Sequence, residues 1–203
     1  MVRAFVGSGG KTTLLKRQAA EYRGQGLKVF VTTTTHMFRE ADTLLTDDAA
    51  AIIRELEEKG YAMAGIPHGE KIRALSYETY LEVCRHADVV LVEADGSKHM
   101  PIKFPNSTEP VLWDNMEEVV VVCGLHALGR PALEVCHRLE LVKECLGICD
   151  DTIITPEHIR KLVWEGYVLP LREKYPHMAI SVYPSHDGTF GQQEIASRIA
   201  AET

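Results

Sequence analysis

Segments with the hydrophobic pattern of β-strands alternate with segments typical of helices along the whole chain. Residues 89–92 (VVLV) and 119–122 (VVVV) are unbroken apolar runs, as in central strands covered on both faces. We predict strands at residues 2–6, 28–32, 61–65, 88–93, 118–123 and 179–183. We predict helices at residues 11–23, 47–59, 77–86, 132–143, 156–164 and 192–201. The alternation indicates an α/β fold, a mostly parallel sheet sandwiched by helices.

Some predicted helices carry capping residues at their ends. Thr155 precedes Pro156, the usual order of an N-cap and a first helical residue, and Gly60 follows the second helix. Residues 98–115 contain three prolines and predict a long loop. Residues 145–176 show helical patterns without a strand pattern, so we expect a small helical cap there. The length of 203 residues fits a single domain, residues 1–203.

Charge and composition narrow the functional classes. The chain carries 29 acidic and 22 basic residues, a net charge of −7, so we expect neither a nucleic-acid partner nor binding to a membrane. No apolar window reaches the length of a membrane-spanning helix, and no basic-then-apolar leader follows Met1. The five cysteines are odd in number and scattered, which indicates reduced thiols. These features predict a cytoplasmic protein.

A glycine-rich turn follows the first predicted strand and precedes the first predicted helix. Glycines let backbone N–H groups point inward, and these donors form a nest for anions with the helix N-terminus. We expect Lys11 to contact the β and γ phosphates and the Thr12 hydroxyl to bind Mg²⁺. The full motif would have glycine at position 5, where this chain has Phe5. The shortened turn predicts a P-loop NTPase-like site for ATP or GTP with Mg²⁺. Its residues are Gly7, Ser8, Gly9, Gly10, Lys11, Thr12 and Thr13.

Two acidic residues lie at the end of a predicted central strand and just beyond it, where a P-loop protein holds its metal. Glu93 ends the apolar run at residues 89–92, and Asp95 and Gly96 follow closely. We expect Glu93 to bind Mg²⁺, directly or through water, and Asp95 to orient an attacking water. The sequence does not separate the roles of the two carboxylates, and both could instead be ordinary turn residues.

Four threonines at residues 32–35 follow the second predicted strand. They fall at the carboxyl edge of the sheet, where open α/β sheets bind ligands, and we do not expect such a run in the core. We predict a γ-phosphate sensor that includes Thr34, which makes Lys11, Asp95 and Thr34 the candidate catalytic residues. In the other interpretation, the run only extends the strand.

Cationic side chains later in the sequence suggest a second ligand. Residues 98–103 (KHMPIK) and 124–131 (GLHALGRP) both follow predicted strands. We expect Lys98, Arg130 and Arg138 to bind an anionic substrate. The nine histidines lack metal-ligand spacing, and Cys145 and Cys149 lack a second cysteine pair, so a metal other than Mg²⁺ is not expected.

These motifs together resemble the YqeC family, described as accessory proteins of selenium-dependent molybdenum hydroxylases. The resemblance implies a nucleotide-dependent step in the maturation of a selenium-containing molybdenum cofactor or its enzyme. The turn is also similar to that of Mur-type ligases, and the strand before Glu93 to that of dethiobiotin synthetase. The family carries an Asn-Lys-x-Asp-like loop for base recognition near its C-terminus, whereas residues 183–187 here read YPSHD, so the choice between ATP and GTP stays open. The matching segments are residues 6–13, 31–37, 90–98, 124–131, 137–138 with Glu140, and 154–157.

Three functions are consistent with these residues. The first is an accessory factor that slowly hydrolyses a nucleoside triphosphate and has a molybdenum hydroxylase, or a selenium or molybdenum cofactor intermediate, as its partner. The second is a small-molecule kinase or Mur-like amide ligase that transfers the γ-phosphoryl group to an anionic acceptor. The third is a carrier of a selenium or cofactor intermediate that binds nucleotide without turnover. Turnover stimulated by an acceptor distinguishes the second, and binding without turnover the third.

Overall fold

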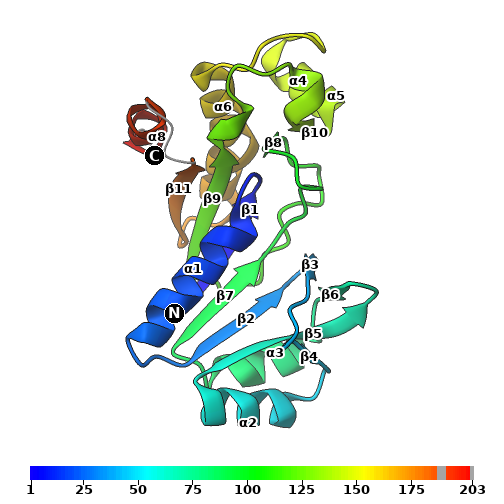
Figure 1. The fold of residues 1–203 in the computed structure, drawn as a ribbon, viewed down its shortest axis with the longest axis vertical. Helices are drawn as coiled ribbons and strands as arrows, with labels where there is room; N and C mark the ends of the chain where they lie inside the picture. The colour runs from blue at the N-terminus through cyan, green and yellow to red at the C-terminus, as the bar shows by residue number, and fades with distance from the viewer. Residues whose placement is uncertain (187–190, 202–203) are drawn as a thin grey trace. The chain divides into compact units, whose positions relative to one another are not determined.

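The computed structural model describes residues 1–186 and 191–201, and its fold is α/β (Figure 1). The chain forms two compact units, each assembled from separate stretches of sequence. Unit 1 comprises Met1–Phe5, Thr12–Asp95 and Val111–Glu117. Unit 2 comprises Val6–Lys11, Gly96–Pro110 and the residues from Glu118 onward.

Unit 1 is built on a mostly parallel sheet. Strands β1 (Val2–Gly7), β7 (Val89–Glu93), β2 (Val29–Thr33) and β5 (Tyr61–His68) are neighbours in this order and run parallel. Strands β6 (Lys71–Arg73) and β3 (His36–Phe38) continue the sheet in antiparallel orientation, and β4 (Leu44–Leu45) pairs with β5. Every residue of β2 and β7 is buried, as expected for strands covered on both faces.

The helices of unit 1 begin and end at residues suited to these positions. They are α1 (Lys11–Gly24), whose first residue belongs to unit 2, α2 (Ala49–Lys59) and α3 (Tyr77–Cys84). The Asp48 side chain accepts a hydrogen bond from the N–H of Ala50 at the start of α2, and Gly60 ends this helix with a φ of 65°. Helix α2 packs against β5 and α3, and the core includes the fully buried Phe30 and Leu91.

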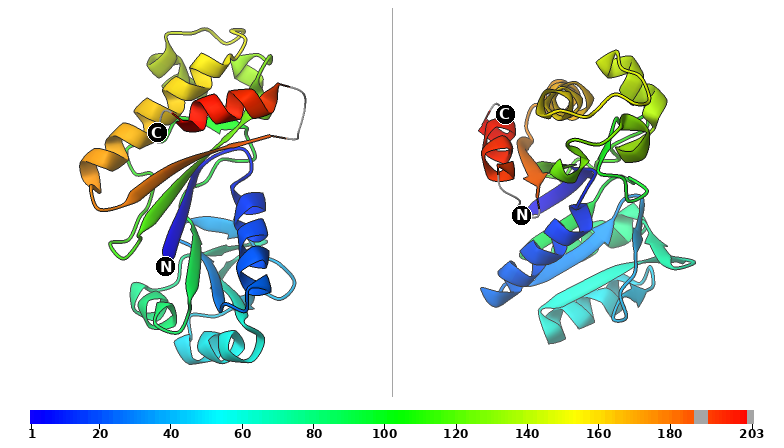
Figure 2. Two further views of the ribbon diagram at one scale, coloured as in Figure 1. Left: turned by 90° about the vertical axis from the view of Figure 1, so that its left-hand side faces the viewer. Right: turned by 45° about the horizontal axis from the view of Figure 1, so that its top comes forward.

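Unit 2 contains two parallel strand pairs with helices around them. Strand β9 (Glu118–Gly124) pairs with β11 (Ala179–Ser185), and β8 (Ile102–Lys103) pairs with β10 (Cys136–His137). Helix α6 (Pro156–Val163) packs against β9, and α8 (Gln192–Ala201) lies along β11 (Figure 2). The remaining helical segments are the 3-10 turn η1 (Leu125–Ala127), α4 (Ala132–Val135), α5 (Leu139–Leu146), the π turn η2 (Trp164–Val168) and α7 (Leu169–Lys174).

The α/β fold and all six predicted strands are confirmed, and Thr155 caps α6 as predicted, through a capping box with His158. The single helix predicted at residues 132–143 is wrong. The chain there forms α4, the short strand β10 and α5 instead. The helix is interrupted because Cys136 and His137 pair with β8, and because Arg138 adopts a left-handed conformation with a φ of 59°.

The single domain with a helical cap at residues 145–176 stays a prediction; these residues hold the end of α5, then α6, η2 and α7. No helix in the described part of the chain combines the length and the apolar character that crossing a membrane requires.

Candidate functional site

The turn between β1 and α1 adopts a backbone that requires glycine. Gly7, Gly9 and Gly10 have φ values of 87°, 75° and 125°, a region that other residues rarely adopt. A Cβ atom on Gly7 would lie 2.1 Å from the carbonyl oxygen of Val122, and one on Gly9 would lie 2.4 Å from the carbonyl oxygen of Pro101. Conformation therefore favours glycine at all three positions, and close packing against neighbouring backbone excludes a side chain at Gly7 and Gly9.

Polar contacts within unit 2 fix this turn. The N–H of Ser8 donates to the carbonyl of Val122 at 2.8 Å, and its hydroxyl donates to the carbonyl of Pro101 at 3.1 Å. The Lys11 ammonium donates to the carbonyl of Gly7 at 2.7 Å, and only 4% of this lysine is exposed. The ammonium is thus folded back onto the turn, where a phosphate bound by the backbone would meet it.

Ser185, at the end of β11, is a further contact of the turn that the sequence did not reveal. Its hydroxyl donates to the carbonyl of Gly9 and lies beside Gly10. It belongs to the stretch at residues 183–187 that replaces the expected base-recognition loop, and Asp187 of that stretch lies outside the described residues. A serine at the end of a distant strand carries no signal by itself, because the contact joins residues 176 positions apart.

In unit 1, Thr12 and Glu93 are brought together by the fold. The Thr12 hydroxyl donates to a carboxylate oxygen of Glu93 at 2.7 Å. Glu93 is the last residue of β7, where it is opposite Phe5 of β1 and only 7% exposed. A hydroxyl and a carboxylate side by side are a suitable donor set for Mg²⁺, which prefers oxygen ligands and keeps several of its waters.

The threonine run is buried, so the expectation that it lies outside the core is wrong for three of its members. The hydroxyls of Thr32, Thr33 and Thr34 donate to the carbonyls of Ala64, Glu93 and Val111, at 2.9, 2.7 and 2.7 Å. These hydrogen bonds satisfy the buried hydroxyls and explain why the core accepts them.

The two remaining candidate catalytic residues of unit 1 are both buried. Asp95 is fully buried just beyond the end of β7. The Thr34 hydroxyl is directed at the carbonyl of Val111, and its N–H donates to the carbonyl of Glu93. A sensor role for Thr34 and a water-orienting role for Asp95 stay predictions.

The three cationic candidates have different surroundings. Arg130 is exposed and pairs with Glu134, four residues further along the chain, at 3.2 Å. Lys98 is exposed, with a φ of 47°. Burial, followed by the charges of Arg138, Lys103 and Lys98, lowers the pKa of His137. The charges of Lys98 and Arg138 therefore both act on His137, whereas Arg130 pairs with Glu134.

Arg138 belongs to a cluster with Lys103 and Glu109 that sequence reasoning missed. Both outer nitrogens of Arg138 donate to the Glu109 carboxylate, one of them at 2.8 Å, and Lys103 donates to the same carboxylate at 2.8 Å. Lys103 also donates to the carbonyl of Gly96 at 2.7 Å, and its side chain is fully buried. Burial alone raises the pKa of Glu109, but the bonds from Arg138 and Lys103 together outweigh it and lower this pKa to about 2. The cluster holds the loop after Asp95 to the start of α5.

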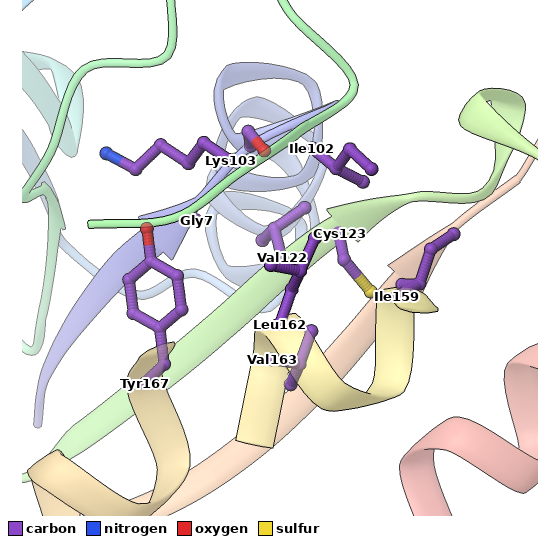
Figure 3. A pocket seen from close by; sticks show the side chains of 10 residues that line it. Gly7, Ile102, Lys103, Val122, Cys123, Ile159, Leu162, Val163 and Tyr167 are labelled. Carbon is purple, nitrogen blue, oxygen red and sulfur yellow. The ribbon is translucent and has the colours of Figure 1, made fainter. Parts of the chain in front are cut away.

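A small pocket beside the turn is mainly apolar (Figure 3). The sulfur of Cys123 and the side chains of Val122 and Leu162 form its wall, while the Lys103 ammonium points away from that wall. Burial raises the pKa of Cys123 to about 12, so its thiol stays protonated. These walls do not suit a phosphate. The lining residues are Gly7, Ser8, Ile102, Lys103, Val122, Cys123, Ile159, Leu162, Val163 and Tyr167.

All five cysteines are free thiols, and no group of three or more histidine, cysteine or acidic side chains suited to a metal is found among residues 1–186 and 191–201.

The family model and a curated relative point to the same family. The family model described as YqeC protein matches residues 3–140. The uncharacterized protein YqeC of Escherichia coli (strain K12) is 31% identical over 174 residues, which are 80% of this chain and 67% of that protein. Among solved structures, the chain is similar to one of the MinC:MinD cell division protein complex of Aquifex aeolicus. This similarity has 12% identity and a TM-score of 0.38, and it covers 98% of this chain and 86% of that one.

Proposed function

This chain belongs to the YqeC family, and we propose that it binds a nucleoside triphosphate together with Mg²⁺. The observation that carries the proposal is the turn at residues 7–10, in which three glycines have positive φ and neighbouring backbone leaves no room for a side chain at Gly7 or Gly9. A turn of this kind before a helix offers backbone N–H groups and the positive end of the helix to an anion.

We propose that the turn and Lys11 bind the phosphates. Lys11 follows the last glycine of the turn, as the lysine of a P-loop does. Lys11 is already folded onto the turn, so little side-chain entropy remains to be lost when a phosphate binds. The N–H of Ser8 is occupied by the carbonyl of Val122, and the N–H groups of Gly9, Gly10 and Lys11 are therefore the proposed phosphate donors.

The metal is assigned to Thr12 and Glu93. In this proposal Mg²⁺ neutralises the charge of the phosphates when it is bound. Glu93 aligns the Thr12 hydroxyl through their hydrogen bond. Asp95 and Thr34 are the proposed groups for a hydrolytic step, with Asp95 positioning a water.

We further propose that nucleotide turnover serves the maturation of a selenium-dependent molybdenum hydroxylase or its cofactor. This role is supported by the resemblance of the chain's motifs to the family and not by any feature of the site. A kinase or amide ligase is the second candidate, and it is favoured by the exposed Lys98, whose charge acts on His137 and would be met by an anionic acceptor there. Arg138, which also acts on His137, already donates both outer nitrogens to Glu109.

Calorimetric titration with ATP and GTP, with and without Mg²⁺, tests the binding proposal. In Lys11→Ala we expect the affinity for triphosphate to fall about 10- to 100-fold, because charge-assisted hydrogen bonds are worth roughly 1.5–3 kcal/mol. Lys16→Ala is the matched control, since Lys16 lies on the same helix but is exposed and paired with Glu40. Equal affinities of the two folded variants would remove Lys11 from the site.

Measuring the release of phosphate from ATP and GTP tests the proposed hydrolytic step. In Glu93→Gln, nucleotide should still bind while Mg²⁺-dependent release of phosphate falls, because the amide can still accept the Thr12 hydrogen bond but carries no charge for the metal. Unchanged release would exclude Glu93 from metal binding. Binding without any release in the wild type would instead favour a missing acceptor or a carrier.

A further inference from the structure

The outer face of three short antiparallel strands in unit 1 carries a cluster of cationic and aromatic side chains. The end of β5, then β6 and then β3 lie side by side in this order (Figure 1). Their register places Arg73 opposite His36, and Lys71 opposite both Phe38 and His68. We call His36, Phe38, His68, Lys71 and Arg73 the cationic face.

The alternation of side chains along these strands turns the cationic face away from the core. Met37 and Ile72, which lie between its members on β3 and β6, are 2% and 0% exposed. The rings of His36 and His68 lie with their centroids 4.8 Å apart although β6 separates their strands, so the two rings lean toward each other across β6. The Lys71 ammonium lies 4.6 Å from the centre of the Phe38 ring.

The charges of this face are all of one sign. In the chain as described, none of the side chains of His36, His68, Lys71 and Arg73 forms an ion pair with a carboxylate. Burial and then the neighbouring His68, Lys71 and Arg73 lower the pKa of His36, and no acidic group offsets them. Like charges opposite each other on paired strands destabilise a sheet. The chain as a whole has a net charge of −7, so a face with only positive groups is unusual for it. An anionic ligand would relieve the repulsion between the cations of this face.

Two adjacent imidazoles could also suggest a metal site, but their neighbours argue against it. Lys71 and Arg73 flank the two rings and would repel a dication. The described residues supply no third histidine, cysteine or carboxylate ligand at this place. An arginine fork, an ammonium and imidazole N–H groups are instead the donors that bind a tetrahedral dianion such as phosphate.

We propose that the cationic face binds the phosphate group of a small molecule, at a site separate from the glycine turn. The face is small, three strands with three paired positions each, and the negative charge of the whole chain opposes binding of a long polyanion. Phe38 offers an aromatic surface, 42% exposed, to an apolar part of the same ligand. This inference does not depend on nucleotide binding.

Nuclear magnetic resonance of the histidine side chains tests the proposal with inorganic phosphate as the probe. The experiment uses the Lys11→Ala chain, so that phosphate bound at the glycine turn does not contribute, and His36→Gln and His68→Gln variants assign the two signals. Phosphate should shift both signals and raise the pH midpoint of His36, because a bound dianion favours the protonated imidazole over the repulsion from His68, Lys71 and Arg73.

Charge variants give the quantitative readout. Arg73→Gln should weaken phosphate binding about two- to fivefold, the range expected for one exposed ionic contact. Arg54→Gln, which removes an exposed arginine from α2, should leave binding unchanged. Histidine signals that do not respond to phosphate, or equal affinities of the two variants, would overturn the proposal. Stronger binding of acetate, of Zn²⁺ or of a single-stranded oligonucleotide at the same signals would also overturn it, since each would identify a different ligand class.

Discussion

Replacing Glu109 with glutamine should destabilise unit 2 in a way that depends on pH. The Glu109 carboxylate accepts hydrogen bonds from Arg138 and Lys103, and its side chain is only 12% exposed. Its pKa falls from 4.5 to about 2 in the folded chain. This difference corresponds to roughly 3 kcal/mol of stability, since one pKa unit is about 1.36 kcal/mol. Because glutamine can still accept hydrogen bonds, we expect Glu109→Gln to cost about 2–3 kcal/mol at pH 7.

The pH dependence follows from the direction of the shift. A carboxyl group whose pKa is lowered on folding contributes its full stabilisation above its unfolded pKa, and this contribution is lost as the pH falls toward the folded pKa. The difference between wild type and Glu109→Gln should therefore be constant above about pH 5.5 and fall to less than about half at pH 3.

Urea unfolding followed by tryptophan fluorescence measures this difference. The two tryptophans lie in different units, Trp113 against Tyr80 in unit 1 and Trp164 against Arg172 in unit 2. In a Trp113→Phe background, the signal of Trp164 reports on unit 2 alone, which avoids treating two units as one transition.

Glu134→Gln is the control for this measurement, because Glu134 pairs with Arg130 at the surface and is 54% exposed. It should change the free energy of unfolding by less than about 1 kcal/mol. Equal losses in Glu109→Gln and Glu134→Gln, or a Glu109→Gln loss that stays the same from pH 7 to pH 3, would refute the assignment of this cluster as a stabilising buried ion pair.

Three further predictions concern the turn, the pair Thr12 and Glu93, and the thiols. Gly9→Ala should lower the free energy of unfolding by about 1–3 kcal/mol, because the φ of Gly9 is 75° and its Cβ would lie 2.4 Å from a carbonyl oxygen. The urea midpoint should fall accordingly, and an unchanged midpoint would contradict the turn geometry. Thr12→Val should abolish the part of nucleotide affinity that depends on Mg²⁺, because it removes the hydroxyl beside Glu93, while titrations in chelator stay unchanged. Cys149→Ser should remove the fast phase of reaction with an aromatic disulfide reagent, since Cys149 is exposed whereas burial raises the pKa of Cys123 to about 12; persistence of that phase would show that another thiol is accessible.

The sequence predicts those parts of the fold and site that depend on local patterns. The buried strand that ends at Glu93 is visible as an apolar run followed by a carboxylate, and the turn as three glycines before a lysine. Strands β3 and β6 were missed because each has three residues, too few to show a period. Their exposed face, with His36 and Arg73, could therefore not be recognised either.

Contacts between distant residues account for the errors. The apolar spacing of residues 132–143 is that of a helix, yet Arg138 leaves the helical conformation and its side chain binds Glu109, which is 29 positions away. The threonine run looked too polar for a core because its acceptors are backbone carbonyls of other strands, which no sequence pattern displays. Sequence patterns thus indicate which groups are present, and tertiary contacts decide which of them meet.

The assembly of each unit from separate stretches has a consequence for biosynthesis. Every residue of unit 1 has been translated once Glu117 has been added, whereas unit 2 still lacks everything from Glu118 onward. The glycine turn belongs to unit 2 although it is translated before most of unit 1, and its contacts include Val122 and Ser185. Domains tend to fold as they emerge from the ribosome. Unit 1 can therefore form before Val122 and Ser185, which contact the turn, have been translated. The nascent chain would then acquire the complete contacts of the glycine turn only after Ser185 has been added.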